Sequence, residues 1–381
     1  MIRPFSRRRI MWAGAVIAVA AVSACGASAP GGSSGSSSSG GSSGSSTSSG
    51  GALVLNGQTV ASASELAQAR KEGSLTMYTS IAAASMTATA QKFQQDTGVK
   101  VNVVSIPSNE LDQRMLTELS GHKLGADVIF TGDGYPAVQS LEKAGIFTPY
   151  CFPLLADIPA KYKQSNCAFF AQELEISVIS YNTSLVTKSQ APTSWHDVLN
   201  SAWKSQISFS DAGESFIYLL PYFWRTQFGL SYWQKLATQN IKFSDAGPAT
   251  MDAVSRGQLK IAMTPVNLPL MAEQSGAPVQ MVIPTDGVPS FAYFTGLASE
   301  AKNPAAAKLF LSWSASKAGQ LEAATIGNWP AMNGLPGPVF AGKQLPPLNQ
   351  IKTLFAEVQP AYATNRPTWL PQWQKLMKIP S

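Results

Sequence analysis

The chain has few of the side chains that most often carry catalysis or hold a metal. Its 381 residues include only two histidines and three cysteines, and charged residues make up 13%, against roughly a quarter in an average protein. Neither His122 nor His196 has a cysteine or a second histidine at the spacing of a metal site. We therefore expect no bound metal, no cofactor and no catalytic residue.

Long apolar runs are also missing after residue 50, where no stretch reaches the roughly 20 residues that a membrane span needs. The net charge of +6 comes mostly from residues 1–24, which carry four arginines and no acidic residue. Without them, 24 basic residues stand against 22 acidic ones. This near balance predicts no nucleic-acid partner.

Residues 1–24 have the pattern of a secretory signal, with a basic start, an apolar run and small residues at the end. The last of them, with Cys25, read VSAC and resemble the bacterial lipobox, in which the cysteine is acylated and becomes the first mature residue. The apolar run is too short for a transmembrane anchor. Export by the Sec route or by the twin-arginine route stays open, because residues 6–11 contain paired arginines.

Residues 26–51 are almost entirely glycine and serine, a composition that cannot bury apolar surface and behaves as a flexible coil. Such a tether reaches on the order of 25–30 Å. We therefore expect residues 25–51 to hold a folded domain at the outer face of the cell membrane, with the lipid on Cys25 as the only membrane contact.

Cys151 and Cys167 remain after the acylated cysteine is set aside. In an oxidising compartment we expect a disulfide between them, which would contribute roughly 3 kcal/mol on the chain-entropy model. The alternative is two buried free thiols.

The first part of the folded chain alternates between strands and helices. Strands are expected at residues 74–78, 99–105 and 126–130, and helices at 82–96, 109–119 and 135–144. This order is typical of a parallel sheet with helices on both faces. After an apolar strand at 175–182, residues 183–286 have strands and helices of their own, and 288–297 reads as a returning strand.

The simplest arrangement is one lobe inserted into another. The expected parts are residues 52–182 and 287–340 for lobe 1, 183–286 for lobe 2, and a Pro-interrupted helical tail at 341–381. The two crossing strands should act as hinges, near residues 181–182 and 288–289.

Several short segments together carry a resemblance to a known family. They are GSLTMYTS (73–80), FQQDTGVKV (93–101), GADV (125–128) with Gly132 and Asp133, LEKAG (141–145), YNT (181–183), PTDG (284–287) and KNPAAA (302–307). In this order and spacing the chain resembles the bacterial extracellular solute-binding proteins of ABC importers. It is most similar to the branch that binds ferric iron, thiamine, polyamines or aminoethylphosphonate.

The resemblance implies an α/β fold of the periplasmic-binding-protein-like type 2 class, with two lobes that close on one ligand in a cleft. It also implies no enzyme activity, a monomer, and a permease and an ATPase as partners. In open parallel sheets, ligands bind beyond the carboxyl ends of the strands. The residues at such positions are Tyr78, Thr79, Ser80, Gly132, Asp133, Asp211, Gly213, Ser215 and Asn267.

Hydroxyls and helix N-termini at these loops favour a small polar ligand that is anionic or zwitterionic, such as a phosphonate. Ordinary turn chemistry is the alternative at each loop. Ferric binders of the family use two adjacent tyrosines where this chain has Asn267 and its neighbours, so direct iron binding is disfavoured. A polyamine stays open, because aromatic residues are available to stack on a cation or a ring. These are Tyr78, Tyr135, Tyr293 and Trp329.

Glu173 and Glu175 lie two residues apart, so they share one face if they belong to a strand. They are interpreted either as an acid–base pair or as the solvated start of a strand, and we favour the second. Two readings from other classes remain, an enzyme on the same fold and a surface sensor or adhesin that no longer transports.

Overall fold

The computed structural model describes residues 46–47, 51–81, 83–132, 134–210, 219–355 and 360–379. Residues 45–381 form one compact unit. The predicted signal, Cys25 and most of the tether lie outside the described residues. Two residues inside the predicted tether belong to a sheet, because β1 (Ser46–Thr47) pairs with β2 (Leu53–Leu55), which pairs with β3 (Gln58–Ala61).

Lobe 1 is built on the predicted parallel strands. Its sheet runs in the order β5 (Lys100–Ser105), β4 (Ser74–Thr79), β6 (Val128–Thr131). The connecting helices are α2 (Ala83–Thr97), α3 (Ser108–Ser120) and α4 (Tyr135–Lys143). The expected alternation of strands and helices is therefore confirmed for this half of the chain.

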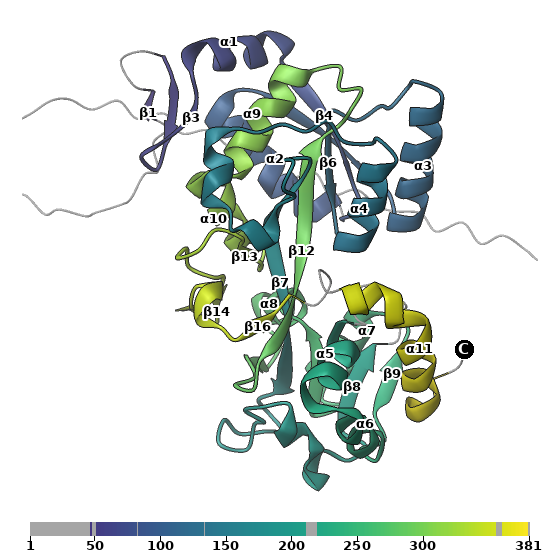
Figure 1. The fold of residues 1–381 in the computed structure, drawn as a ribbon. Helices are drawn as coiled ribbons and strands as arrows, with labels where there is room; N and C mark the ends of the chain where they lie inside the picture. The colour runs from purple at the N-terminus through teal and green to yellow at the C-terminus, as the bar shows by residue number, and fades with distance from the viewer. Residues whose placement is uncertain are drawn as a thin grey trace, which may run out of the picture. The chain divides into compact units, whose positions relative to one another are not determined.

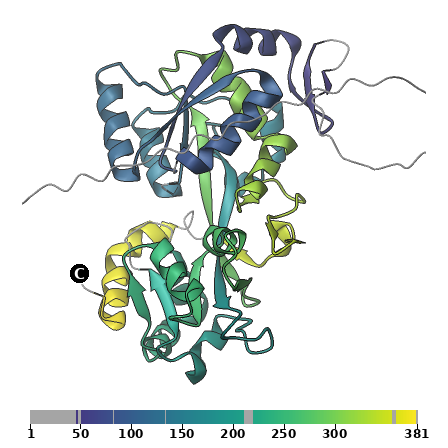
Figure 2. The same ribbon diagram turned by 180° about the vertical axis from the view of Figure 1, so that it is seen from behind.

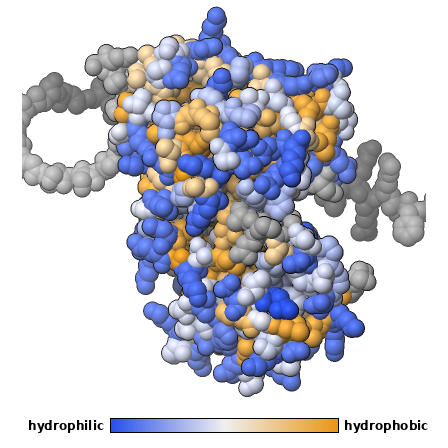
Figure 3. Space-filling model, in the orientation of Figure 1, coloured by the Kyte–Doolittle hydropathy of each residue, from blue (hydrophilic) through white to orange (hydrophobic). Residues whose placement is uncertain are grey.

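Three further helices complete lobe 1, namely α1 (Ala63–Glu72), α9 (Pro304–Ser314) and α10 (Lys317–Thr325). Aromatic packing joins α9 to α2, because the Phe93 ring lies 5.1 Å from Phe310 and 5.5 Å from Trp313. All three rings are fully buried. The face drawn in Figure 3 is mostly hydrophilic between scattered apolar patches, as expected when the large apolar side chains lie inside.

Lobe 2 contains residues 183–286, the segment predicted to form a lobe of its own. Its strands are β8 (Ile207–Ser210), β9 (Lys242–Ser244), β10 (Ile261–Pro265) and β11 (Val279–Val282). Its helices are α5 (Leu219–Phe228), α6 (Leu230–Ala237), α7 (Gly247–Ser255) and α8 (Asn267–Gln274). Two short 3-10 turns, His196–Leu199 and Ser201–Trp203, precede β8.

Two long strands belong to both lobes (Figure 1). β7 (Phe170–Asn182) pairs with β12 (Val288–Leu297) through residues 170–176, and with β10 and β11 through residues 177–182. The far end of β12 pairs with β6. The two lobes therefore share one continuous sheet, and β7 changes lobe between residues 176 and 177.

This pairing corrects the predicted hinge on β7. Tyr181 and Asn182 pair with β10 and β11, inside the sheet of lobe 2. They are not at the crossing, which lies earlier in β7, between Ile176 and Ser177. Every residue of β7 is buried, on both sides of the crossing. The sequence pattern therefore does not show where β7 changes its neighbouring strand.

The C-terminal part differs from the predicted helical tail. A hairpin of β14 (Val339–Phe340) and β15 (Lys343–Gln344) is followed by β16 (Thr353–Leu354), which pairs with the start of β12. Among the described residues of this part, Leu348–Gln350 form a short 3-10 turn and α-helix is confined to α11 (Pro360–Met377). Pro346 and Pro347 explain the difference, since proline donates no backbone N–H and disfavours helix in the residue before it.

α11 packs on lobe 2, beside α5 and α6 in both views (Figures 1 and 2). The Trp373 ring lies 5.2 Å from Trp233, and the Tyr362 ring lies 5.0 Å from Tyr222. The chain thus returns to lobe 2 after β16, a third passage between the lobes that the sequence did not predict.

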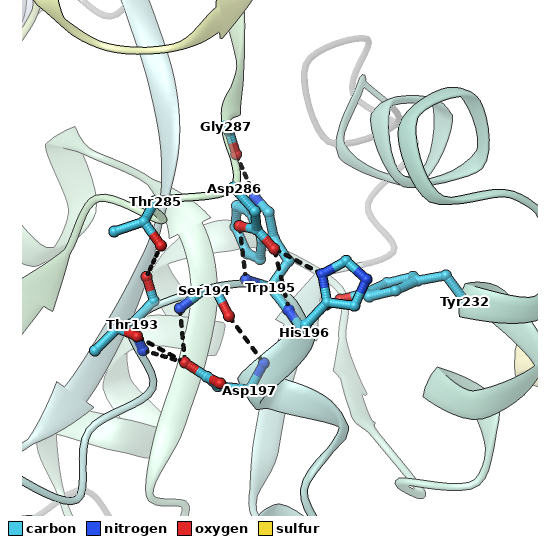
Figure 4. A network of polar contacts seen from close by, with 9 residues as sticks. All are labelled: Thr193, Ser194, Trp195, His196, Asp197, Tyr232, Thr285, Asp286 and Gly287. Carbon is cyan, nitrogen blue, oxygen red and sulfur yellow. Dashed lines mark hydrogen bonds and ion pairs between the residues drawn. The ribbon is translucent and has the colours of Figure 1, made fainter.

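The loop before β12 is fixed by a polar network (Figure 4). The Asp286 carboxylate accepts bonds from the backbone N–H groups of Trp195 and His196, at 3.0 and 3.3 Å, and lies 2.9 Å from His196 Nδ1. The Trp195 indole donates to the Gly287 carbonyl at 2.7 Å. Two of the residues that carried the family resemblance therefore hold the start of β12 against lobe 2.

Cys151 and Cys167 are bonded to each other. The predicted disulfide is confirmed, and the alternative of two free thiols is wrong.

Candidate ligand site

The loops after β4 and β6 come together, as the rule for parallel strands predicts. Ser80 Oγ lies 3.1 Å from Thr131 Oγ1 and accepts a bond of 3.1 Å from the backbone N–H of Gly132. Ser80 and Gly132 are both partly exposed. These two predicted residues therefore form one small polar surface at the carboxyl edge of the lobe 1 sheet.

Tyr78 and Thr79 are directed at structural partners. The Tyr78 hydroxyl lies 3.1 Å from a carboxylate oxygen of Glu118 and accepts from the Arg114 guanidinium at 2.8 Å. Burial raises the pKa of this phenol, and the Glu118 charge adds to the rise. Thr79 is fully buried, and its hydroxyl accepts from the backbone N–H of Ile81. Ser80 is thus the member of this loop with an accessible hydroxyl.

On lobe 2, Asn267 is the first residue of α8, directly after β10. Its Oδ1 is buried with no hydrogen-bond partner among the described residues. Ser177, Ser210, Thr264 and Pro265 line a small hollow at the same ends of β8 and β10. The other predicted ligand residues, Asp133, Asp211, Gly213 and Ser215, lie outside the described residues.

Tyr293, one of the aromatic residues predicted to be available for stacking on a ligand, lies beside these loops. It lies on β12 where the pairing register with β7 shifts, a β-bulge of the kind that redirects side chains near sites. A Cβ on Gly132 would lie 2.7 Å from the Tyr293 ring, so only glycine allows this approach. The Tyr293 hydroxyl donates to Glu175 Oε2 at 2.6 Å. Tyr293 therefore joins the Ser80–Gly132 surface to the crossing strands.

Glu173 and Glu175 are each only 2% exposed, so the predicted solvated strand start is wrong. β7 begins at Phe170, five residues before the predicted start at 175, and β12 and β13 (Trp329–Pro330) flank this part of it. Asn328 Nδ2 donates to Glu173 Oε1 at 3.1 Å. Burial raises the pKa of Glu173 to about 8, against the effect of the Asn328 bond and with further contributions from nearby carboxylates.

Comparison with known proteins identifies the family. The family described as bacterial extracellular solute-binding proteins matches residues 88–344. The chain belongs to this family. It is a solute-binding protein of an ABC transporter and not an enzyme, so the alternative of an enzyme on the same fold is wrong. None of the described helices is long and apolar enough to cross a membrane.

Individual relatives of this solute-binding protein are distant. The Fe(3+)-binding periplasmic protein of Serratia marcescens is 25% identical over 169 residues, 44% of this chain and 49% of that protein. An uncharacterised protein of Haemophilus influenzae is 22% identical over 264 residues, 66% of this chain and 75% of that protein.

Solved structures agree on the fold. The periplasmic binding protein AfuA of Actinobacillus pleuropneumoniae, with fructose-6-phosphate bound, has a TM-score of 0.63 at 19% identity and covers 81% of this chain and 99% of its own. Iron-bound HitA of Pseudomonas aeruginosa has the same TM-score and identity and covers 80% and 99%. The predicted periplasmic-binding-protein fold is confirmed.

Proposed function

We propose that this solute-binding protein captures a small polar solute between its two lobes and delivers it to a membrane permease. The observation that carries the proposal is the position of Tyr293. Its ring contacts Gly132 at the edge of the lobe 1 sheet, and its hydroxyl bonds Glu175 on the strand that enters lobe 2. A ligand on this surface would therefore touch both the lobe 1 loops and the strands about which the lobes move.

The ligand that this surface supports best is a zwitterion with an oxyanion group and an amine, such as an aminoalkyl phosphonate. The Ser80 hydroxyl and the start of α2 next to it suit an oxyanion, and a phosphate ester is the ligand named for the AfuA structure. The buried carboxylates of β7 disfavour a bare anion.

Ferric iron is the second candidate, because relatives named above bind it. No group of three or more His, Cys, Asp and Glu side chains that could hold a metal occurs in the described part of the chain. Two adjacent tyrosines are also absent from the sequence. Ferric citrate therefore serves as a competing ligand in the test rather than as the expected one.

Replacing Ser80 by alanine is expected to weaken binding of 2-aminoethylphosphonate by roughly tenfold or more. A hydrogen bond to a charged group contributes about 1.5–3 kcal/mol, and each 1.4 kcal/mol is a tenfold change in affinity. Titration calorimetry on the full chain measures it. Ser189→Ala, an exposed serine of lobe 2, is the matched control.

Small-angle scattering on the same samples should show a smaller radius of gyration with ligand, because family lobes close as rigid bodies about hinges. Equal affinities of Ser80→Ala and parent would show that the site is misplaced. Binding of ferric citrate alone would overturn the ligand class.

We further propose that the lipid on Cys25 holds the protein at the outer face of the membrane. Cys25→Ala is expected to move the protein from the membrane fraction to the medium or periplasm, because the acylation site is lost. Cell fractionation with immunodetection measures the shift, and metabolic labelling with a palmitate analogue should mark only the parent. A variant that stays in the membrane fraction would mean that residues 10–22 act as an anchor.

A further inference from the structure

Glu173 is a buried acid at the junction of the two lobes. It is 2% exposed and lies four residues before Ser177, where β7 enters lobe 2. Its hydrogen-bond partner is Asn328, in the loop between α10 and β13. No lysine, arginine or histidine nitrogen lies within ion-pair distance of it among the described residues. A lone buried carboxylate is unfavourable, so this acid must either hold a proton or meet a positive group.

Among the described residues, the Asn328 amide donates to Glu173 and leaves an unpaired acceptor oxygen beside it. Asn328 is 94% buried, since 6% of it is exposed, and its Oδ1 has no hydrogen-bond partner among the described residues. The Nδ2 of the same amide bonds Glu173, which places this oxygen beside the carboxylate. Buried polar atoms are rarely left without partners. An unpaired acceptor next to an acid points to a ligand with several N–H donors.

Lobe 2 adds a second acceptor to this junction. The loop of Asn328 meets the start of α8, because a Cβ on Gly327 would lie 2.8 Å from Leu270 and 3.7 Å from the Cα of Asn267. Asn267 Oδ1 is also buried without a partner in the described part of the chain. Rotation of the lobes about residues 176–177 would part this contact, so an open form would give solvent access to Asn328 and Glu173.

The two charged side chains that act on Glu173 are both acidic. Glu175 on β7 and Glu322 on α10 both raise its pKa, in addition to burial. Tyr293 on β12 binds Glu175 through a neutral hydroxyl. The charge of Lys92 lowers the pKa of Glu322, and the charge of Asp96 raises it. A proton therefore neutralises Glu173 at neutral pH in the absence of a ligand.

We propose that Glu173, Asn328 and Asn267 form a subsite for the ammonium group of the solute, and that binding drives the proton of Glu173 into solvent. The inference rests on the proposed function, since it assigns the residues that bind the ammonium end of the ligand proposed above. The carboxylic acid loses its proton to the buffer, and the ammonium group, which keeps its three protons, donates to the carboxylate and to the two amide oxygens.

Proton release fixes the pH dependence of binding. Between pH 6 and pH 8 the carboxylate must ionise before it can pair with the ammonium, so affinity should rise by up to about tenfold per pH unit. Above pH 8 affinity should level off, and it should fall once the ligand amine loses its proton, near pH 10 for a primary amine.

Titration calorimetry of the full chain tests this with two probes, 2-aminoethylphosphonate and ethylphosphonate, which lacks the amine. Titrations at pH 6, 7 and 8 in buffers of different ionisation enthalpy give the number of protons released. Glu173→Gln keeps the shape and the bond from Asn328 but has no charge to release. Asp252→Asn, which removes an exposed carboxylate of lobe 2, is the matched control.

The expected result is release of close to one proton per 2-aminoethylphosphonate at pH 6, together with tighter binding at pH 8. Ethylphosphonate should bind more weakly and without proton release. Glu173→Gln should abolish the release and weaken 2-aminoethylphosphonate by at least tenfold at pH 8, whereas Asp252→Asn should match the parent.

Two results would overturn the subsite and separate it from the proposed function. If both probes bind equally and without proton release, solute capture stands and the ammonium subsite is wrong. If neither probe binds at 10 mM while ferric citrate binds, the proposed ligand class fails together with the subsite.

Discussion

Glu173→Gln is expected to make the protein more stable than the parent at pH 9, by several kcal/mol and at most on the order of 5 kcal/mol. The pKa of Glu173 is about 8 in the fold, against an ordinary value of 4.5 for a glutamate in the unfolded chain. Between these values the folded state holds one proton more than the unfolded state. The free energy of unfolding therefore falls as pH rises through this window, and glutamine, which does not titrate, removes that loss.

Denaturant unfolding of parent and variant at pH 5, 7 and 9 measures the effect. The two stabilities should be similar near pH 5, where the parent side chain is neutral in the fold, and should diverge toward pH 9. Asp252→Asn should follow the parent throughout. Parallel stability curves for parent and Glu173→Gln would show that Glu173 ionises normally in the fold, and this would also remove the electrostatic basis of the ammonium subsite.

The same residue shows where sequence reasoning stops. Two glutamates at the start of an apolar strand suggest exposure, because isolated acidic side chains are rarely buried. Glu173 is covered by Asn328 and β13, which lie about 150 residues later in the chain. No local pattern signals a partner at that distance, so the burial, the raised pKa and the lack of a counter-charge appear only in the fold.

Ser80 and Gly132 show what could be predicted. Each follows a strand of a parallel pair, and the carboxyl ends of such strands meet at one edge of the sheet. Tyr78 and Thr79, the last two residues of β4, face the interior, because successive strand residues point to opposite faces and both faces of this sheet are covered. Position in the loop was thus predictable, whereas the accessible side chain was not.

The C-terminal passage was missed for a different reason. Residues 341–355 contain prolines and very short strands that carry no periodic pattern, and β16 is held by its pairing with β12. The helical part of the tail was predicted correctly as helix, but a sequence pattern does not tell which lobe a helix packs on. The aromatic residues of α11 decide that, and they find their partners in α5 and α6.

Trp373→Ala is expected to lower the free energy of unfolding by about 3–5 kcal/mol, the cost of truncating a large buried aromatic side chain. Trp373 is 1% exposed, and its ring lies 5.2 Å from Trp233 and 5.9 Å from Trp224. Alanine would leave a cavity between α11 and the core of lobe 2. Because α11 ends the third passage between the lobes, its release should also expose the chain after β16 to protease.

Urea unfolding followed by tryptophan fluorescence measures the loss, and limited proteolysis followed by mass spectrometry locates the first cleavage. Gln372→Ala, at the exposed neighbouring position, is the matched control and should change stability by less than about 0.5 kcal/mol. If Trp373→Ala unfolds like the parent and resists protease equally, α11 does not contribute to the core of lobe 2. A large loss of stability with unchanged affinity for 2-aminoethylphosphonate would show that α11 stabilises lobe 2 without shaping the ligand site.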